Sequence, residues 1–86
     1  MPTPIKSYSQ LKVGDYYQDC AYHPCICTRI NEADDEVQGI SLIDGSYPRA
    51  CSVKHCDVQL LSLEEALSWK LKGPPEGGVP EDKRWW

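Results

Sequence analysis

Short alternations of apolar and polar residues, rather than long helical repeats, run through the first two thirds of the chain. Segments rich in β-branched, aromatic and cysteine residues are separated by turn-forming residues, and this pattern is typical of short strands. The pattern predicts five strands, which cover residues 16–22, 25–30, 37–43, 46–53 and 57–61.

Turn signals fix the connections between these strands. The charged run at residues 31–36 predicts a solvated turn. Asp44-Gly45 lies between apolar runs and predicts a tight two-residue hairpin, because the central residues of that turn need positive φ. Pro48 lacks a backbone donor, so the segment around it is expected at an edge or in an irregular conformation. Gly39 marks a bulge or a point of close approach.

The period of two also assigns side chains to faces. In residues 25–30 it places Cys25 and Cys27 on one face, opposite Ile26. In residues 37–43 it places Ile40 and Leu42 together. Because the chain contains no phenylalanine, its core must be filled by aliphatic residues, tyrosine and cysteine. We therefore expect Cys25 and Cys27 to line the interior as small hydrophobic residues.

Two capping-box spacings predict helical structure. Ser7 and Gln10 favour one helical turn at residues 8–11, before Gly14 turns the chain into the first strand. Ser62 and Glu65 begin a helix over residues 62–73, which ends at a glycine followed by two prolines. The expected apolar stripe of this helix comprises Leu63, Ala66 and Leu67, and Trp69 is expected to pack the helix onto the strands.

The elements predict a mainly β domain with a C-terminal helix. Its parts are an N-terminal arm with a helical turn (1–12), a small five-stranded, partly open barrel (13–61), the helix (62–73) and a flexible tail rich in proline and glycine (74–86).

Three stretches carry a resemblance to a known architecture: "LKVGDYY" entering the first strand, "GISLIDGS" at the central hairpin, and "SVKHCDVQLL" as a turn plus the closing strand. In this order they resemble the SH3-like small β-barrels, the group that includes Tudor-like and KOW-like modules. The resemblance covers roughly residues 13–61 and implies the partly open barrel. No tryptophan lies in that range and its tyrosines have no cage-like spacing, so the resemblance implies no particular ligand.

Size and charge narrow the class of function. The chain has 86 residues, with 13 acidic against 9 basic side chains and a net charge of −4. Nucleic-acid affinity comes mostly from Lys and Arg, so this balance disfavours a nucleic-acid partner. The apolar runs are too short for a membrane span and the N-terminus lacks a secretory pattern, so we expect a cytoplasmic protein without a membrane partner. Five cysteines, an odd number, then favour reduced thiols.

Seven side chains of the types that bind zinc occur in this short chain. Cys20 and His23 have the spacing of one ligand pair, and His55 with Cys56 could supply a second. We hypothesise that these four residues bind one zinc ion. The sequence favours the simpler interpretation, in which the cysteines are packing residues and the chain holds no cofactor. The seven are Cys20, His23, Cys25, Cys27, Cys51, His55 and Cys56.

Neither pattern nor spacing indicates an enzyme. His55, Cys56 and Asp57 are consecutive, and the side chains of sequence neighbours point apart, whereas a catalytic His reaches its Cys through the fold. We therefore expect a domain without catalytic activity.

The tail ends in two tryptophans, a residue type favoured at binding hot spots. Trp85 and Trp86 could dock into a partner, fold back onto the barrel, or form an unstructured aromatic end. Together with Tyr16 and Tyr47 they are the candidate partner-binding residues. The sequence thus favours a protein-interaction module with a protein partner, and a small structural zinc-binding domain is the alternative.

Overall fold

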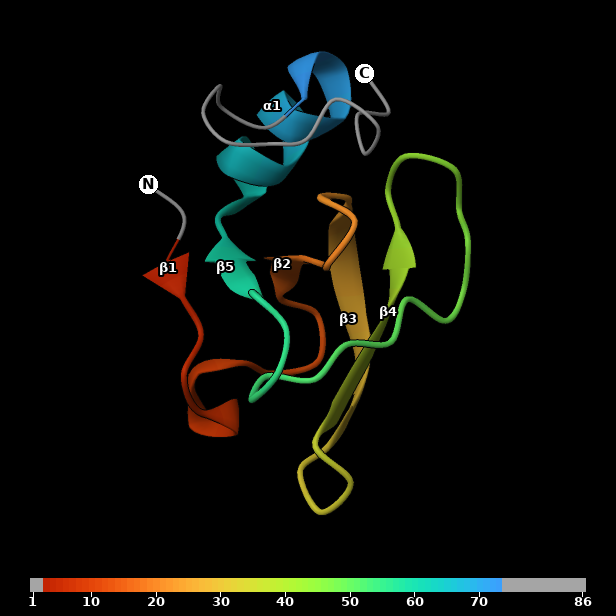
Figure 1. Cartoon of the computed structure of the whole chain (residues 1–86). Coiled ribbons are helices and arrows are strands. Elements are labelled where there is room, and N and C mark those ends of the chain that lie inside the picture. The colour runs from red at the N-terminus through yellow and green to blue at the C-terminus, as the bar shows by residue number, and fades with distance from the viewer. Residues whose placement is uncertain (1–2, 74–86) are drawn as a thin grey trace.

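The computed structural model describes residues 3–73 (Figure 1), and the predicted tail lies outside them. Five strands, one 3-10 helix and one α-helix follow one another along this range. They are β1 (Thr3–Pro4), the 3-10 helix (Tyr8–Gln10), β2 (Tyr16–Gln18), β3 (Pro24–Asn31), β4 (Glu36–Ser41), β5 (Gln59–Leu61) and α1 (Leu63–Lys72). No helix in this range is long and apolar enough to cross a membrane.

The strands form one antiparallel sheet in the order β1-β5-β2-β3-β4, and the sheet is not closed. The longest pairing joins β3 to β4, with a register shift between Cys27 and Arg29. In Figure 1 α1 stands above β5 and β2, at one end of the strands. The prediction of a mainly β, five-stranded domain with a C-terminal helix and an N-terminal helical turn is confirmed.

One of the predicted strands is wrong. Residues 46–53 form no strand, and only Cys51 pairs with β4, through a bridge to Val37. Pro48 has no N–H to donate, so the chain approaches β4 without a continuous ladder. The sheet nevertheless has five strands, because β1, which was not predicted, pairs with β5. In this pairing Thr3 lies opposite Leu60.

The turn at Asp44-Gly45 also differs from the predicted two-residue hairpin. The turn comprises the four residues from Leu42 to Gly45. It is closed by a hydrogen bond from the backbone N–H of Ser41 to the carbonyl of Ser46, at 3.0 Å. Gly45 has φ +73°, but Asp44 does not adopt positive φ, and its carboxylate instead accepts from the N–H of Ser46. Asp44 therefore stabilises a wider turn through its side chain.

Two apolar clusters lie on opposite faces of the sheet. The larger lies on the inner face, where Tyr17, Cys25 and Cys27 are buried, and it includes Val37 and Cys51. The expectation that Cys25 and Cys27 line the interior is thus confirmed. Ile40, on the opposite face of β4, is 37% exposed.

The smaller cluster joins α1 to the sheet. Ala66 and Trp69 are buried against Leu61, with Tyr16 and Leu42 packed beside them. The capping box of Ser62 and Glu65 and the stop at Gly73 form as predicted. The predicted stripe is wrong in part, because Leu63 and Leu67 are 54% and 49% exposed. The helix instead packs through Ala66 and Trp69, which are separated by one turn.

Candidate metal centre

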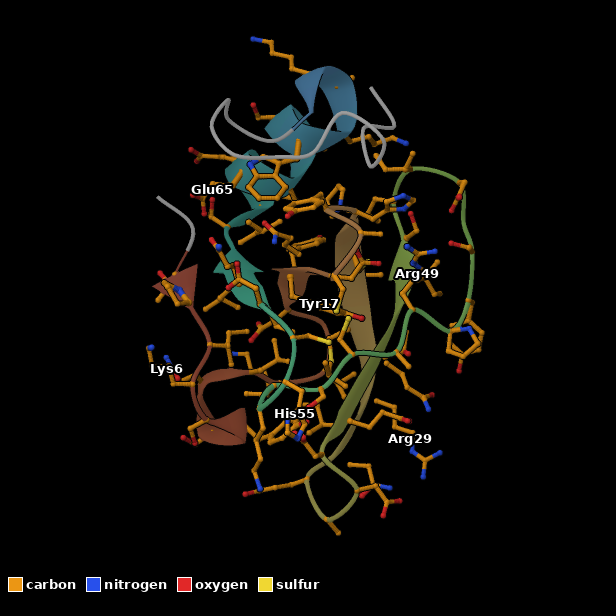
Figure 2. The ribbon with its side chains drawn as sticks, viewed as in Figure 1. Lys6, Tyr17, Arg29, Arg49, His55 and Glu65 are labelled. Carbon is orange, nitrogen blue, oxygen red and sulfur yellow. The ribbon has the colours of Figure 1, made fainter. Side chains whose placement is uncertain are left out.

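Three cysteines from separate segments meet beside the inner core. The Sγ atoms of Cys20, Cys51 and Cys56 all lie within 4.8 Å of one another. Cys20 follows β2, Cys51 pairs with β4, and Cys56 lies in the turn before β5. Figure 2 shows sulfur atoms gathered below the Tyr17 label, between it and His55.

The turn that carries Cys20 is organised by the carboxylate of Asp19. Its Oδ1 accepts from the backbone N–H groups of Ala21 and His23, both at 2.9 Å. Asp19 also bonds His23 through its own backbone N–H. These bonds hold Tyr22 at φ 64°, which is uncommon for a bulky residue. Asp19 therefore ends β2 and projects Cys20 from a compact turn.

An ion pair joins this turn to the segment that carries Cys51. Arg49 Nε lies 2.7 Å from Asp19 Oδ2, and the Asp19 side chain is only 4% exposed. The Arg49 segment is fixed to β4, since the Arg49 N–H donates to the Gly39 carbonyl at 2.7 Å and Cys51 exchanges two backbone bonds with Val37. The buried Tyr17 hydroxyl donates to the Arg49 carbonyl at 2.8 Å. Cys20 and Cys51 are therefore held together by the residues that flank them.

A second carboxylate fixes the turn that carries Cys56. The Asp35 carboxylate accepts from the hydroxyl of Ser52 and, at 2.7 Å, from that of Tyr8. These hydroxyl donors hold the pKa of Asp35 below its usual value, the Ser52 bond contributing most. The Cys56 N–H donates to the Ser52 carbonyl at 2.8 Å, which closes the turn. Asp35 itself has φ 52°, a conformation that aspartate tolerates better than most residues.

The spacing of the sulfur atoms suits a soft cation. Cys20 Sγ lies 3.2 Å from Cys51 Sγ, and the Cys20 N–H also points at that sulfur, at 3.4 Å. Thiolates 2.3 Å from a tetrahedral zinc ion are about 3.8 Å apart, so a small outward movement of one sulfur would accommodate the metal. Backbone N–H groups directed at sulfur favour the thiolate form.

Without a cation the thiols of Cys20 and Cys51 hold their protons tightly. Burial, together with the neighbouring thiols of Cys56 and Cys51, raises the pKa of Cys20 well above its usual value. Burial also raises the pKa of Cys51 to about 11. Neither thiol is a ready nucleophile at neutral pH, whereas a bound cation would displace the protons and favour the thiolates.

The structure brings together two of the four hypothesised ligands, Cys20 and Cys56, and adds Cys51 to them. His23 is not in this cluster. Its ring is buried and Nδ1 lies 2.8 Å from Ser41 Oγ. Burial, and then the charge of Arg49, lower the pKa of His23 and favour its neutral form.

His55 lies next to Cys56 but outside the group of three. Its side chain is 82% exposed, and Nε2 lies 4.0 Å from Asp35 Oδ2. His55 and two of the cysteines nevertheless line one cavity. It is lined by Gln18, Cys20, Tyr22, His55, Cys56 and Asp57.

The candidate partner-binding residues lie apart from this centre. Tyr16 is half-buried beside α1, and Tyr47 is 60% exposed in the segment before Pro48. Trp85 and Trp86 fall outside the described residues.

Comparisons of this chain with protein-family models, with curated proteins and with solved structures found no match.

Proposed function

We propose that this chain is a small zinc-binding domain without catalytic activity, in which Cys20, Cys51 and Cys56 bind the ion. The observation that carries the proposal is the convergence of three sulfur atoms within 4.8 Å. Thiolate is the ligand type that selects soft or borderline cations, and zinc is the one most often held structurally by cysteine in proteins.

Packing alone accounts poorly for the cluster. Cys25 and Cys27 show what packing cysteines look like here, since both are almost completely buried in the inner core. Cys20, in contrast, is exposed as a residue, although its sulfur is partly shielded where it lies against that of Cys51. An exposed cysteine fills no core volume, so its position beside two other thiols is better explained by ligation.

The three cysteines lie in the irregular parts of the fold, where a metal would contribute most. Each stands outside the five strands, in a turn or in the segment that follows Pro48. A chain of 86 residues buries a modest core, and small domains often gain stability from a structural metal. Zinc would tie together the segments after β2, beside β4 and before β5.

Metal content tests the proposal directly. Untagged protein, purified with a reductant and without chelator, is expected to contain one zinc ion per chain by elemental analysis. Cys51→Ala is expected to weaken zinc affinity by about 100-fold or more, since loss of a direct ligand exceeds the effect of losing an outer partner. Competition with a chromophoric chelator measures this change.

Cys27→Ala is the matched control, because it also removes a buried cysteine but one outside the cluster. It is expected to lower stability while keeping the zinc. A zinc content near zero in the wild-type protein would contradict the proposal, as would equal zinc affinity in the two variants.

A second candidate function, a protein-interaction module, is favoured by one surface of α1. Leu63, Leu67 and Leu71 are spaced by four residues along the helix and are 54%, 49% and 78% exposed. A row of this kind is how an amphipathic helix anchors in the apolar groove of a partner protein.

Leu67→Glu tests this second candidate. A photo-crosslinker at the exposed Ser68 is expected to capture a specific partner in wild-type cells, and the substitution is expected to abolish that product without a change in melting temperature. Glu64→Lys alters charge on the same helix and serves as the control. Equal crosslinking in all three proteins would count against a role for this row of leucines.

A further inference from the structure

The three cysteines leave one corner of a tetrahedral zinc site to be filled. We infer that the imidazole of His55 fills it through Nδ1, with Nε2 directed toward the carboxylate of Asp35. The inference rests on the proposed binding of zinc by Cys20, Cys51 and Cys56.

The position of His55 supports this role. It precedes Cys56 in a turn closed by the bond from the Cys56 N–H to the Ser52 carbonyl, and its own N–H donates to Ser52 Oγ at 3.0 Å. The backbone of His55 is thereby fixed, while its side chain remains 82% exposed and lines the same cavity as Cys20 and Cys56. The ring can therefore turn about its side-chain bonds without disturbing the fold.

The carboxylate of Asp35 determines which ring nitrogen of His55 is available to the metal. Nε2 lies 4.0 Å from Asp35 Oδ2, which is just beyond hydrogen-bond range. A histidine that binds zinc usually donates its other ring N–H to a carboxylate, a carbonyl or water, and this bond fixes the tautomer. With Nε2–H facing Asp35, Nδ1 is the nitrogen left to bind the metal. Asp35 would then position the ligand as well as the turn through Ser52.

The other polar groups are less suitable. His23 is committed to Ser41, and Cys25 and Cys27 lie outside the group of three sulfur atoms and are almost completely buried. Asp57 and Gln18 line the cavity and offer oxygen, which zinc accepts alongside nitrogen and sulfur. His55 is favoured over them because it has a carboxylate in place for its second nitrogen.

NMR of the histidine rings tests the inference. In uniformly ¹⁵N-labelled protein, long-range ¹H–¹⁵N correlations distinguish Nδ1 from Nε2 in both histidines. On titration with one equivalent of zinc, the Nδ1 resonance of His55 is expected to shift to the value of a metal-bound nitrogen, and Nε2 is expected to carry the proton. The ring of His23 keeps its signals and serves as an internal reference.

Substitutions give an independent readout. His55→Ala is expected to weaken zinc binding about tenfold or more and to change the visible spectrum of the cobalt-substituted protein, because one nitrogen ligand is replaced by water. Lys54→Ala, in the same turn, is the matched control and is expected to leave affinity and spectrum unchanged.

The outcomes separate the two proposals. If the wild-type protein binds zinc while the His55 resonances stay in place and His55→Ala retains its cobalt spectrum, the assignment of the fourth ligand is overturned and the cysteine site stands. A ring that binds through Nε2 would overturn the role given to Asp35. If no zinc binds at all, both the inference and the proposed function fail.

Discussion

Replacing Asp19 with alanine is expected to lower the free energy of unfolding by about 3 to 5 kcal/mol, the cost typical of breaking a buried ion pair. The Asp19 side chain is 4% exposed and that of Arg49 is 24% exposed. The substitution removes the ion-pair partner of Arg49, which then keeps only its side-chain bond to Ser46 Oγ among the described contacts. It also removes the acceptor for the N–H groups of Ala21 and His23. Since small domains are stable by roughly 5 to 15 kcal/mol, the loss is a large fraction of the total.

Urea denaturation followed by circular dichroism measures this effect. Asp57→Ala removes an exposed aspartate in the turn before β5 and is expected to change stability by no more than about 0.5 kcal/mol. Asp19→Asn keeps an oxygen for the two N–H groups but loses the charge, so its stability is expected to lie between those of wild type and Asp19→Ala. A loss below about 1 kcal/mol in Asp19→Ala would show that the ion pair does not hold the Cys20 turn to the Cys51 segment.

Gly39→Ala is expected to lower the free energy of unfolding by about 3 kcal/mol, at the upper end for overpacking a core. A Cβ at this position would lie 2.5 Å from the Ile26 carbonyl oxygen and 2.5 Å from the Tyr17 hydroxyl. Tyr17 is fully buried and bonded to Arg49, so it has little room to move. Thermal or urea unfolding of the purified variant measures the loss.

Three further variants separate crowding from backbone strain. Gly45→Ala has open space around its Cβ but φ +73°, so it is expected to cost about 1 kcal/mol from conformation alone. Tyr17→Phe removes the hydroxyl that a Cβ at residue 39 would meet. The double variant Gly39→Ala/Tyr17→Phe is therefore expected to be more stable than the sum of the single losses predicts. Strict additivity would contradict an origin in the contact with Tyr17.

Local chemistry made much of the fold predictable. The capping boxes at Ser7 and Ser62 depend on residues three apart, so sequence spacing alone identifies them. The burial of Cys25 and Cys27 follows from the period of two along β3. β1 was not predictable in this way, because Thr3-Pro4 has no strand pattern of its own and pairs only because β5 provides an edge. Tertiary pairing thus determines the shortest strands.

In the candidate site, too, local spacing identified some residues and tertiary pairing determined the others. Cys20 and Cys56 were identified because each stands close to a histidine in a predicted turn. Cys51 has no such neighbour: it lies 31 residues from Cys20 and reaches it because its segment pairs with Val37. His23 has the right spacing from Cys20, but the Asp19 turn directs its ring to Ser41 instead. The sequence did contain one indication that Cys51 lies near Cys20. Asp19 directly precedes Cys20 and Arg49 stands two residues before Cys51, and opposite charges beside two cysteines favour their approach.

The segment that carries Cys51 affects how readily the sheet can pair with a second molecule at high protein concentration. An exposed sheet edge offers unpaired backbone groups to a strand from another molecule, and this is a common route to aggregation. Among the described strands, the β4 edge is occupied by the bridge between Val37 and Cys51 and by the bond from Arg49 to Gly39. At the opposite edge, the part of β1 that the structure describes has two residues and ends in Pro4. Within the described residues, both edges are therefore poor templates for strand addition.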